Sequence, residues 1–162
     1  MPNGLTDTDR GYAAALGSLR AIAKGAHVVV GVRGQKGAAR VDGDKSPLTL
    51  VEVATVNEYG SEDGHVPERS FLRSTFDAQK TEIGRALAAG LDKIILGRGT
   101  TDDLLGRVGL KLAGDVVQTI NTGVPPPNAP ATIARKGSSH TLIDEGRLRQ
   151  SIDHEVRRGR GR

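Results

Sequence analysis

The stretch that decides the fold is residues 69–123, which read RSFLRSTFDAQKTEIGRALAAGLDKIILGRGTTDDLLGRVGLKLAGDVVQTINTG. Apolar residues recur at helical spacing through the first half, and Gly97-Arg98-Gly99 then interrupts the pattern. This half predicts the longest helix, over residues 69–96. Its predicted apolar stripe consists of Leu72, Phe76, Ile83, Leu87, Leu91 and Ile94.

The second half predicts another long helix that ends before Gly123. Thr100 or Thr101 can cap its start, and Asp102 and Asp103 follow at the positive end of the helix dipole. Its predicted stripe is Leu105, Val108, Leu112, Val116 and Ile120. Two long helices joined by a short glycine turn predict an antiparallel pair.

The segments before this pair alternate between helix and strand patterns. Helical spacing predicts a helix over 8–24, and a β-branched run predicts a strand over 27–33. Glycines, a proline and several charges predict a flexible loop over 34–47. Residues 48–59 fit a strand or a helix, and the spacing of their apolar positions favours a short helix.

The segments after the pair begin with three consecutive prolines, 125–127. Polyproline II geometry is stiff, so we expect residues 124–141 to form an extended arm that contains one helical turn over 131–136. A short helix follows at 147–150, and alternating apolar residues predict a last strand over 151–157.

Together these elements predict an α+β fold. We expect a small antiparallel sheet packed with two or three helices, plus the extended proline-rich arm. Residues 1–156 form one domain in this interpretation, and residues 157–162 form a basic tail.

Charge is distributed unevenly along the chain. The 23 basic and 19 acidic residues give a net charge of +4, and the last six residues contain four arginines and no acid. The rest of the chain is therefore neutral. The absence of cysteine excludes a thiol nucleophile, a disulfide and a Cys-ligated zinc site. No apolar run approaches the ~20 residues that a membrane helix needs, so we expect no membrane partner.

Motifs for catalysis or cofactor binding are weak. The run Gly31–Gly37 lacks the Gly-Lys-Ser/Thr ending of a phosphate loop. His27, His65, His140 and His154 are too scattered for a helical metal site. We therefore expect no enzyme activity, no metal and no cofactor; a hydrolase built on His140 and Asp144 is a minor alternative.

Two neighbouring segments carry a more specific pattern, Asn57-Glu58-Tyr59-Gly60 and Val66-Pro67-Glu68-Arg69-Ser70-Phe71-Leu72-Arg73. One interpretation is structural, with Phe71 packed inside and the arginines in water. The other is a subunit contact through Arg69, Phe71 and Arg73, because arginine and aromatic residues are enriched in interfaces.

With two C-terminal segments, this pattern resembles the neck and tail-completion proteins of long-tailed bacteriophages, a virion-morphogenesis group that includes tail terminators. The matching segments are Asn57–Gly60, Pro67–Leu72, Pro126–Lys136 and Leu142–Ile152. Their order and spacing match over roughly residues 50 to 156. The chain departs from the pattern at Ser70, where a second proline is common, and at Glu145, where threonine is usual.

The resemblance implies a structural subunit of the virion, assembled in the host cytoplasm. It implies a hexameric or twelve-fold ring at the head–tail junction that completes or terminates the tail and joins it to the head. The partners would be further copies of the chain, neighbouring neck or connector proteins and tail-tube proteins. We expect the arm to reach a neighbour, with Ile133 as an anchor. The candidate interface residues are Arg69, Phe71, Arg73, Pro126, Pro127, Ile133, Arg135, Lys136 and Arg147.

The basic tail has two interpretations. It is either solvated or contacts genomic DNA or an acidic partner through Arg157, Arg158, Arg160 and Arg162. The alternative function is a nucleic-acid-binding protein that uses this tail with Arg98, Arg107 and Lys111. That alternative predicts steeply salt-dependent DNA binding by the isolated chain.

Overall fold

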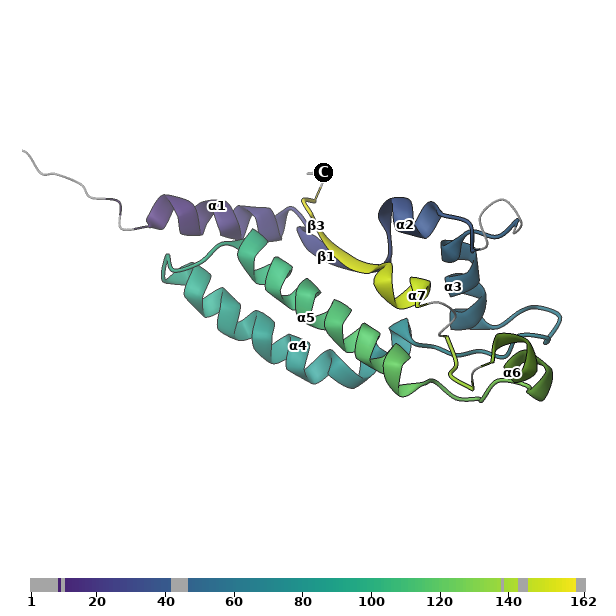
Figure 1. Ribbon diagram of the computed structural model, residues 1–162. Helices are drawn as coiled ribbons and strands as arrows, with labels where there is room; N and C mark the ends of the chain where they lie inside the picture. The colour runs from purple at the N-terminus through teal and green to yellow at the C-terminus, as the bar shows by residue number, and fades with distance from the viewer. Residues whose placement is uncertain (1–8, 10, 42–46, 138, 143–145, 160–162) are drawn as a thin grey trace, which may run out of the picture.

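A computed structural model describes residues 9, 11–41, 47–137, 139–142 and 146–159. Two long helices and a two-stranded sheet form the body; one short helix near the N-terminus lies at one end, and the other short helices gather at the other end (Figure 1). The elements are α1 Tyr12–Ala23, β1 His27–Val32, α2 Gly34–Ala38, α3 Leu50–Tyr59, α4 Leu72–Ile95, α5 Thr101–Thr122, α6 Pro130–Lys136, α7 Arg147–Gln150 and β3 Ile152–Arg157.

The predicted α+β class is confirmed. Strands β1 and β3 pair antiparallel, with Val30 opposite His154, so the first and last predicted strands form the sheet. Helix α5 packs on this sheet, and α4 packs on α5 as an outer layer. The predicted short helix in 48–59 is also confirmed: it is α3, and Thr49 and Glu52 form a capping box at its start.

Helix α5 approaches the sheet most closely at Gly109. A Cβ atom at this position would lie 2.5 Å from Cγ2 of Val28 and 2.7 Å from Cδ2 of His154. Both distances are shorter than a normal carbon–carbon contact of ~3.5–4.0 Å. Only glycine therefore fits where the helix crosses the two strands.

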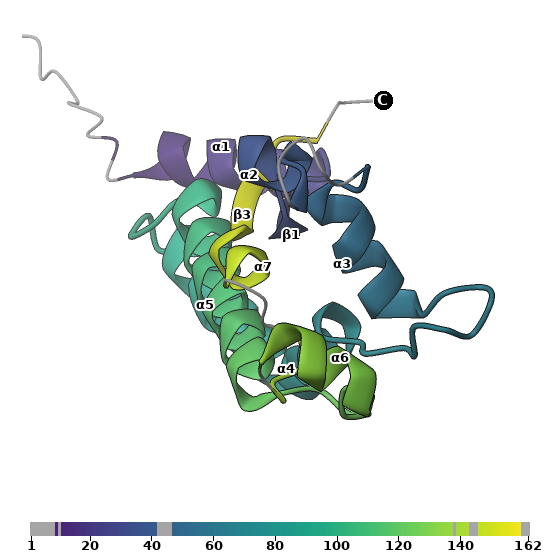
Figure 2. The same ribbon diagram turned by 45° about the vertical axis from the view of Figure 1, so that its right-hand side comes forward.

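The core has two parts along the length of the molecule. The larger part lies near α3 and α7 and is built around Phe71, with Val116 and Ile120 of α5. The smaller part, Ile94, Leu104 and Val108, lies between α4 and α5 toward α1. Helix α5 contributes residues to both parts of the core and connects them; Figure 2 shows its course.

The predicted apolar stripe of α4 is only partly correct. Ile94 is buried and Leu72 and Ile83 pack against the core, but Phe76, Leu87 and Leu91 are exposed. The reason is that α4 is an outer helix, and the face that α5 covers is narrower than the apolar stripe. A surplus of apolar side chains is left on the surface of α4.

The predicted flexible loop over 34–47 is wrong at its start, where residues 34–38 form helix α2. Gly37 is buried, and a Cβ there would come within 3.0 Å of Val51 and 3.2 Å of Val32. The missing side chain lets α2 pack tightly on β1 and α3, so this glycine serves packing as well as a turn. Residues 42–46 of the predicted loop lie outside the described residues.

The predicted extended arm over 124–141 instead folds back on the domain. The backbone N–H of Val124 donates to Oγ1 of Thr141 at 2.9 Å, and the Asn128 amide donates to the carbonyl of His140 at 2.9 Å. Both ends of the segment are therefore held together. The predicted helical turn is confirmed as α6, and the segment is a closed loop that contains it.

Gly109 and Gly114 in α5 provide a stability test. We expect Gly109→Ala to lower the free energy of unfolding by about 1–3 kcal/mol, because the added Cβ overlaps the sheet. No atom lies within 4 Å of a Cβ at Gly114, so Gly114→Ala should raise it by about 0.5–1 kcal/mol through helix propensity. Urea unfolding of both variants measures the difference, and equal effects would contradict this view of the packing.

Candidate functional site

The first part of the candidate site is the entry to α4, where a carboxylate from α3 caps the helix. Glu58 is 3% exposed, and its carboxylate accepts hydrogen bonds from the backbone N–H groups of Phe71 at 2.8 Å, Leu72 at 2.9 Å and Arg73 at 2.9 Å. The first N–H groups of a helix have no partner inside the helix, and they form its positive end. Glu58 therefore satisfies these donors with a full negative charge.

Side chains complete the environment of this carboxylate. The Ser70 hydroxyl donates to Glu58 at 2.8 Å, and the Arg73 guanidinium donates at 3.1 Å. Arg73 also donates to Glu68 at 2.7 Å and stacks over the Tyr59 ring at 4.6 Å. The segments around residues 57–60 and 67–73, singled out by their sequence, thus form one cluster.

The surroundings of Glu58 determine its protonation. Burial raises its pKa, but the hydrogen bonds from the backbone of Leu72 and Arg73, from Ser70 and from the backbone of Phe71 outweigh burial. The net effect lowers the pKa below its ordinary value of 4.5. The carboxylate is therefore charged at neutral pH.

A second buried charged residue, Arg69, ties this cluster to the proline segment. It is 6% exposed; its Nε donates to the carbonyl of Pro126 at 2.8 Å, and its Nη2 donates to the carbonyl of Pro127 at 3.2 Å. Its backbone N–H donates to the carbonyl of Asn57 at 2.7 Å. Burial lowers the pKa of this guanidinium. Arg69 therefore links α3, the entry to α4 and the proline segment.

These contacts surround a groove of about 490 Å³. All four segments of the sequence resemblance contribute to its walls, from α3, the entry to α4, the proline segment and the region of α7. The residues of those segments that line it are Asn57, Pro67, Arg69, Pro126, Pro127, Asn128, Ala129, Thr132, Leu142, Arg147 and Leu148. We call this feature the motif groove.

The structure corrects two predicted interface residues. Phe71 has an exposed fraction of 0% and is a core residue, so it presents no surface to another subunit. Arg69 is buried in contacts within the chain and likewise presents almost no surface. The structural interpretation of the motif is therefore right for Phe71, whereas the arginines do not simply remain in water.

The other interface candidates lie around the motif groove. Pro126 and Pro127 are exposed on its wall, and Ile133 is half-buried in α6. Arg147 is exposed and donates to the carbonyl of Val41. Arg135 and Lys136 belong to α6, but their side chains lie outside the described part of the structure.

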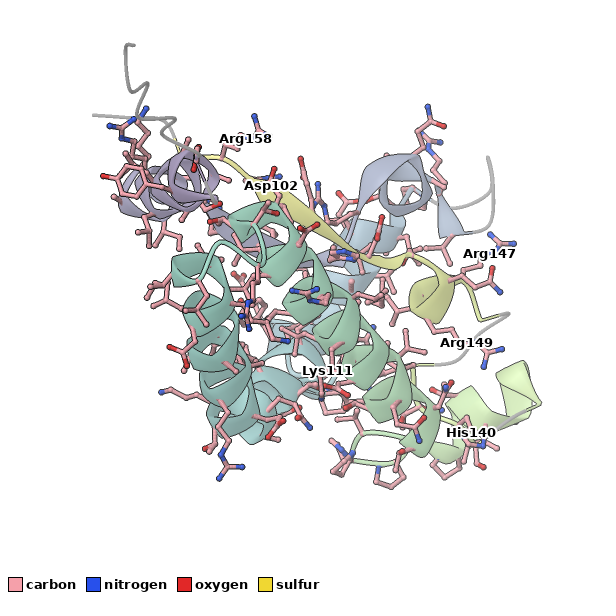
Figure 3. All side chains as sticks on the ribbon, turned by 90° about the vertical axis from the view of Figure 1, so that its left-hand side faces the viewer. Asp102, Lys111, His140, Arg147, Arg149 and Arg158 are labelled. Carbon is pink, nitrogen blue, oxygen red and sulfur yellow. The ribbon has the colours of Figure 1, made fainter. Side chains whose placement is uncertain are left out.

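The two described tail arginines, Arg157 and Arg158, make their ion pairs away from the motif groove. Arg157 pairs with Glu155 at 3.2 Å, and Arg158 pairs with Asp102 at the start of α5 at 2.9 Å (Figure 3). Arg160 and Arg162 lie outside the described residues.

The basic residues of the alternative function do not gather with this tail. Lys111 is more than two helical turns from Asp102 and pairs with Asp115 at 2.7 Å. Arg107 lines a groove between α4 and α5, and Arg98 lies in the turn between these helices. For the hydrolase alternative, His140 lies beside α6 and Asp144 is outside the described residues.

Exposed apolar side chains form a second feature, at the end where α1 begins and α4 ends. Tyr12, Ile95 and Leu96 are 75%, 58% and 62% exposed. They share this end because the backbone before α1 passes close to the backbone after α4: a Cβ on Gly11 would lie 3.3 Å from the backbone of Gly97. We call Tyr12, Ile95 and Leu96 the end patch.

Within the described residues, no group of three or more histidine, aspartate or glutamate side chains is arranged to hold a metal ion. The helices described here include none that is long and apolar enough to cross a membrane. No protein-family model, curated protein or solved structure matches the chain. The functional proposal therefore depends on the residues and their geometry.

Sequence reasoning found the segments of this site but missed the role of Glu58. The available signal for this cap is an acidic residue at the end of one helix, followed about a dozen residues later by the start of another helix. It becomes interpretable only when the turn between the helices is known, because the cap crosses from one helix to the next.

Glu58→Gln tests the cap. We expect this variant to lower the free energy of unfolding by about 3 kcal/mol, because it removes the charge that the N–H groups and Arg73 surround. Glu68→Gln is the matched control, since Glu68 also pairs with Arg73 but is exposed; its loss should be below about 1 kcal/mol. Equal losses in chemical unfolding would contradict the capping role.

The lowered pKa of Glu58 predicts a pH dependence. The stabilisation from this group is fully present above its unfolded-state pKa, near 4.5, and is lost as the pH falls through the lower folded-state value. The difference in unfolding free energy between the native chain and Glu58→Gln should therefore shrink below pH 4.5. Glu52 and Asp63, whose pKa values are also lowered, are common to both proteins and cancel. A difference that stays constant with pH would contradict the prediction.

Proposed function

We propose that this chain is a non-enzymatic structural protein of a long-tailed phage virion. In this proposal it forms a ring at the head–tail junction, completes or terminates the tail and joins it to the head. Its partners are further copies of itself and the neighbouring connector and tail-tube proteins.

The observation that carries the proposal is the motif groove. The four segments that resemble the neck and tail-completion family are spread over about 100 residues of sequence, yet all four line this one groove. Some residues of these segments make contacts within the chain: Glu58 caps α4, Arg69 binds the proline segment and Phe71 lies in the core. The remaining residues, such as Pro126, Pro127 and Arg147, are exposed around the groove, where they are available to a neighbouring subunit.

The distribution of apolar surface also supports assembly. The end patch and the exposed stripe of α4 place apolar side chains in water, and exposed apolar patches commonly mark interaction sites. The end patch and the motif groove lie at opposite ends of the elongated molecule (Figure 1). Contacts between unlike surfaces of identical subunits generate a ring when the rotation closes.

The closed form of the proline segment changes how it would take part. A free arm could reach a distant neighbour, whereas a loop held by Arg69 and Asn128 presents a preformed surface. A preformed surface loses less conformational entropy on docking. We therefore place the contact at the groove wall, without an arm that extends to the next ring.

Electron microscopy tests the function directly. The purified chain should form rings, and phage that lack it should produce heads that fail to join tails or tails of abnormal length. Normal virions in its absence would refute the proposal. A chain that stays monomeric and is also absent from purified virions would refute it as well.

Ile95→Glu tests the end patch. A charge in this exposed apolar patch should prevent subunit association while leaving the fold intact, because Ile95 is 58% exposed. Leu110→Glu is the matched control on α5, since Leu110 is 65% exposed and lies outside the end patch. Analytical ultracentrifugation should show loss of the assembled species for Ile95→Glu alone. Assembly that survives Ile95→Glu, or is lost equally in both variants, would contradict the role of the end patch.

A further inference from the structure

Three cationic side chains lie around one hollow beside the start of α5. Arg20 of α1, Lys24 directly after α1 and Arg158 after β3 line this hollow of about 600 Å³, together with Thr100, Thr101 and Asp102. These three cations come from two segments at opposite ends of the sequence. We call this feature the basic hollow.

In sequence, Arg158 belongs to the arginine-rich C-terminus, which contributes to the net charge of +4. Arg157 precedes Arg158, and two further arginines follow within four residues. The nearby carboxylates are Asp102 and Asp103 at the start of α5 and Glu155 of β3. Among the described residues, Arg20, Lys24, Arg157 and Arg158 therefore stand near these three carboxylates.

The cations of the hollow differ in their partners. Arg158 is paired with Asp102 at 2.9 Å. Arg20 and Lys24 are exposed, and no carboxylate in the described ranges pairs with either of them. Two neighbouring cations that pair with no described carboxylate leave a local positive potential that attracts an anion.

We propose that the basic hollow contacts the phosphate backbone of duplex DNA. Guanidinium and ammonium groups are the usual partners of phosphate oxygens, and a duplex presents many phosphates along one face. Cations from α1 and from the C-terminal segment would contact neighbouring phosphates. The choice of DNA over another polyanion rests on the proposed function, since a ring at the head–tail junction surrounds the genome.

The contact is weak and depends on salt. Each neutralised phosphate contributes about −0.9 to the slope of log affinity against log salt. Three such contacts, one for each cation of the hollow, would weaken binding about 40-fold between about 50 and 200 mM salt. Such a contact can guide DNA through a ring without holding it, because it dissociates readily at physiological salt.

The test measures binding of the full chain to a short fluorescent DNA duplex by anisotropy across a salt series. Arg20→Glu/Lys24→Glu should reduce the magnitude of the salt slope by about two and weaken binding at low salt. Arg20→Gln/Lys24→Gln should give a reduction in the same direction without adding negative charge near the end of α1. Circular dichroism should show unchanged helix content in both.

The matched control is Lys80→Glu/Arg85→Glu. Both residues are exposed on α4, outside the basic hollow, and the change in net charge is the same. This control should lose affinity through net charge alone and keep the native slope. Equal changes of slope in the two Glu pairs would overturn the proposal, because the effect would then be general rather than local.

Two other outcomes would also overturn it. The first is absence of binding to the duplex at about 50 mM salt, where phosphate contacts are strong. The second is equal affinity for poly-glutamate, which would indicate an acidic protein partner instead. Ring formation by Arg20→Gln/Lys24→Gln is scored separately. If the chain forms rings but does not bind DNA, the DNA contact is refuted and the proposed function is not. If the chain binds DNA but forms no rings and does not enter virions, the proposed function is refuted and the DNA-binding surface is not.

Discussion

The rest of the structure depends on the Glu58 carboxylate at the start of α4. A helix of 24 residues begins against this group, which satisfies backbone donors that would otherwise be buried without partners. The same carboxylate binds the backbone N–H of Phe71, whose side chain lies in the larger core. Arg69, two residues before Phe71, then holds the proline segment. Two buried charges, Glu58 and Arg69, therefore hold α3, the entry to α4 and the proline segment together.

This arrangement explains why buried and exposed residues alternate in the motif segments. Glu58, Arg69 and Phe71 point inward and make the groove possible, while Pro126, Pro127 and Arg147 are exposed around it. The motif segments thus contain a rigid frame and the surface that the frame presents. A ring subunit needs both, because a neighbour can dock without a large loss of entropy only on a surface that is already formed.

The two ends of the molecule have different chemical character. The larger core and the motif groove lie at one end, and the end patch and the basic hollow lie at the other. Helix α5 spans the distance between them and is held to the sheet at Gly109. In the proposed ring, the end patch contacts a neighbouring subunit and the basic hollow contacts DNA; the two features share no residue, so each can be altered without the other.

The sequence alone determined the α+β class, the two long helices, the helix before residue 60 and the pairing candidates for the sheet, because local periodicity and glycine turns specify these elements. It also determined that the excess charge belongs to the C-terminal tail. Only the tertiary structure decided that Phe71 and Arg69 are buried and that the proline segment closes into a loop. It also decided that Arg20 and Lys24 lie in the same hollow as Arg158. Each of these depends on contacts between residues far apart in the chain, and local sequence patterns do not encode which distant groups will meet.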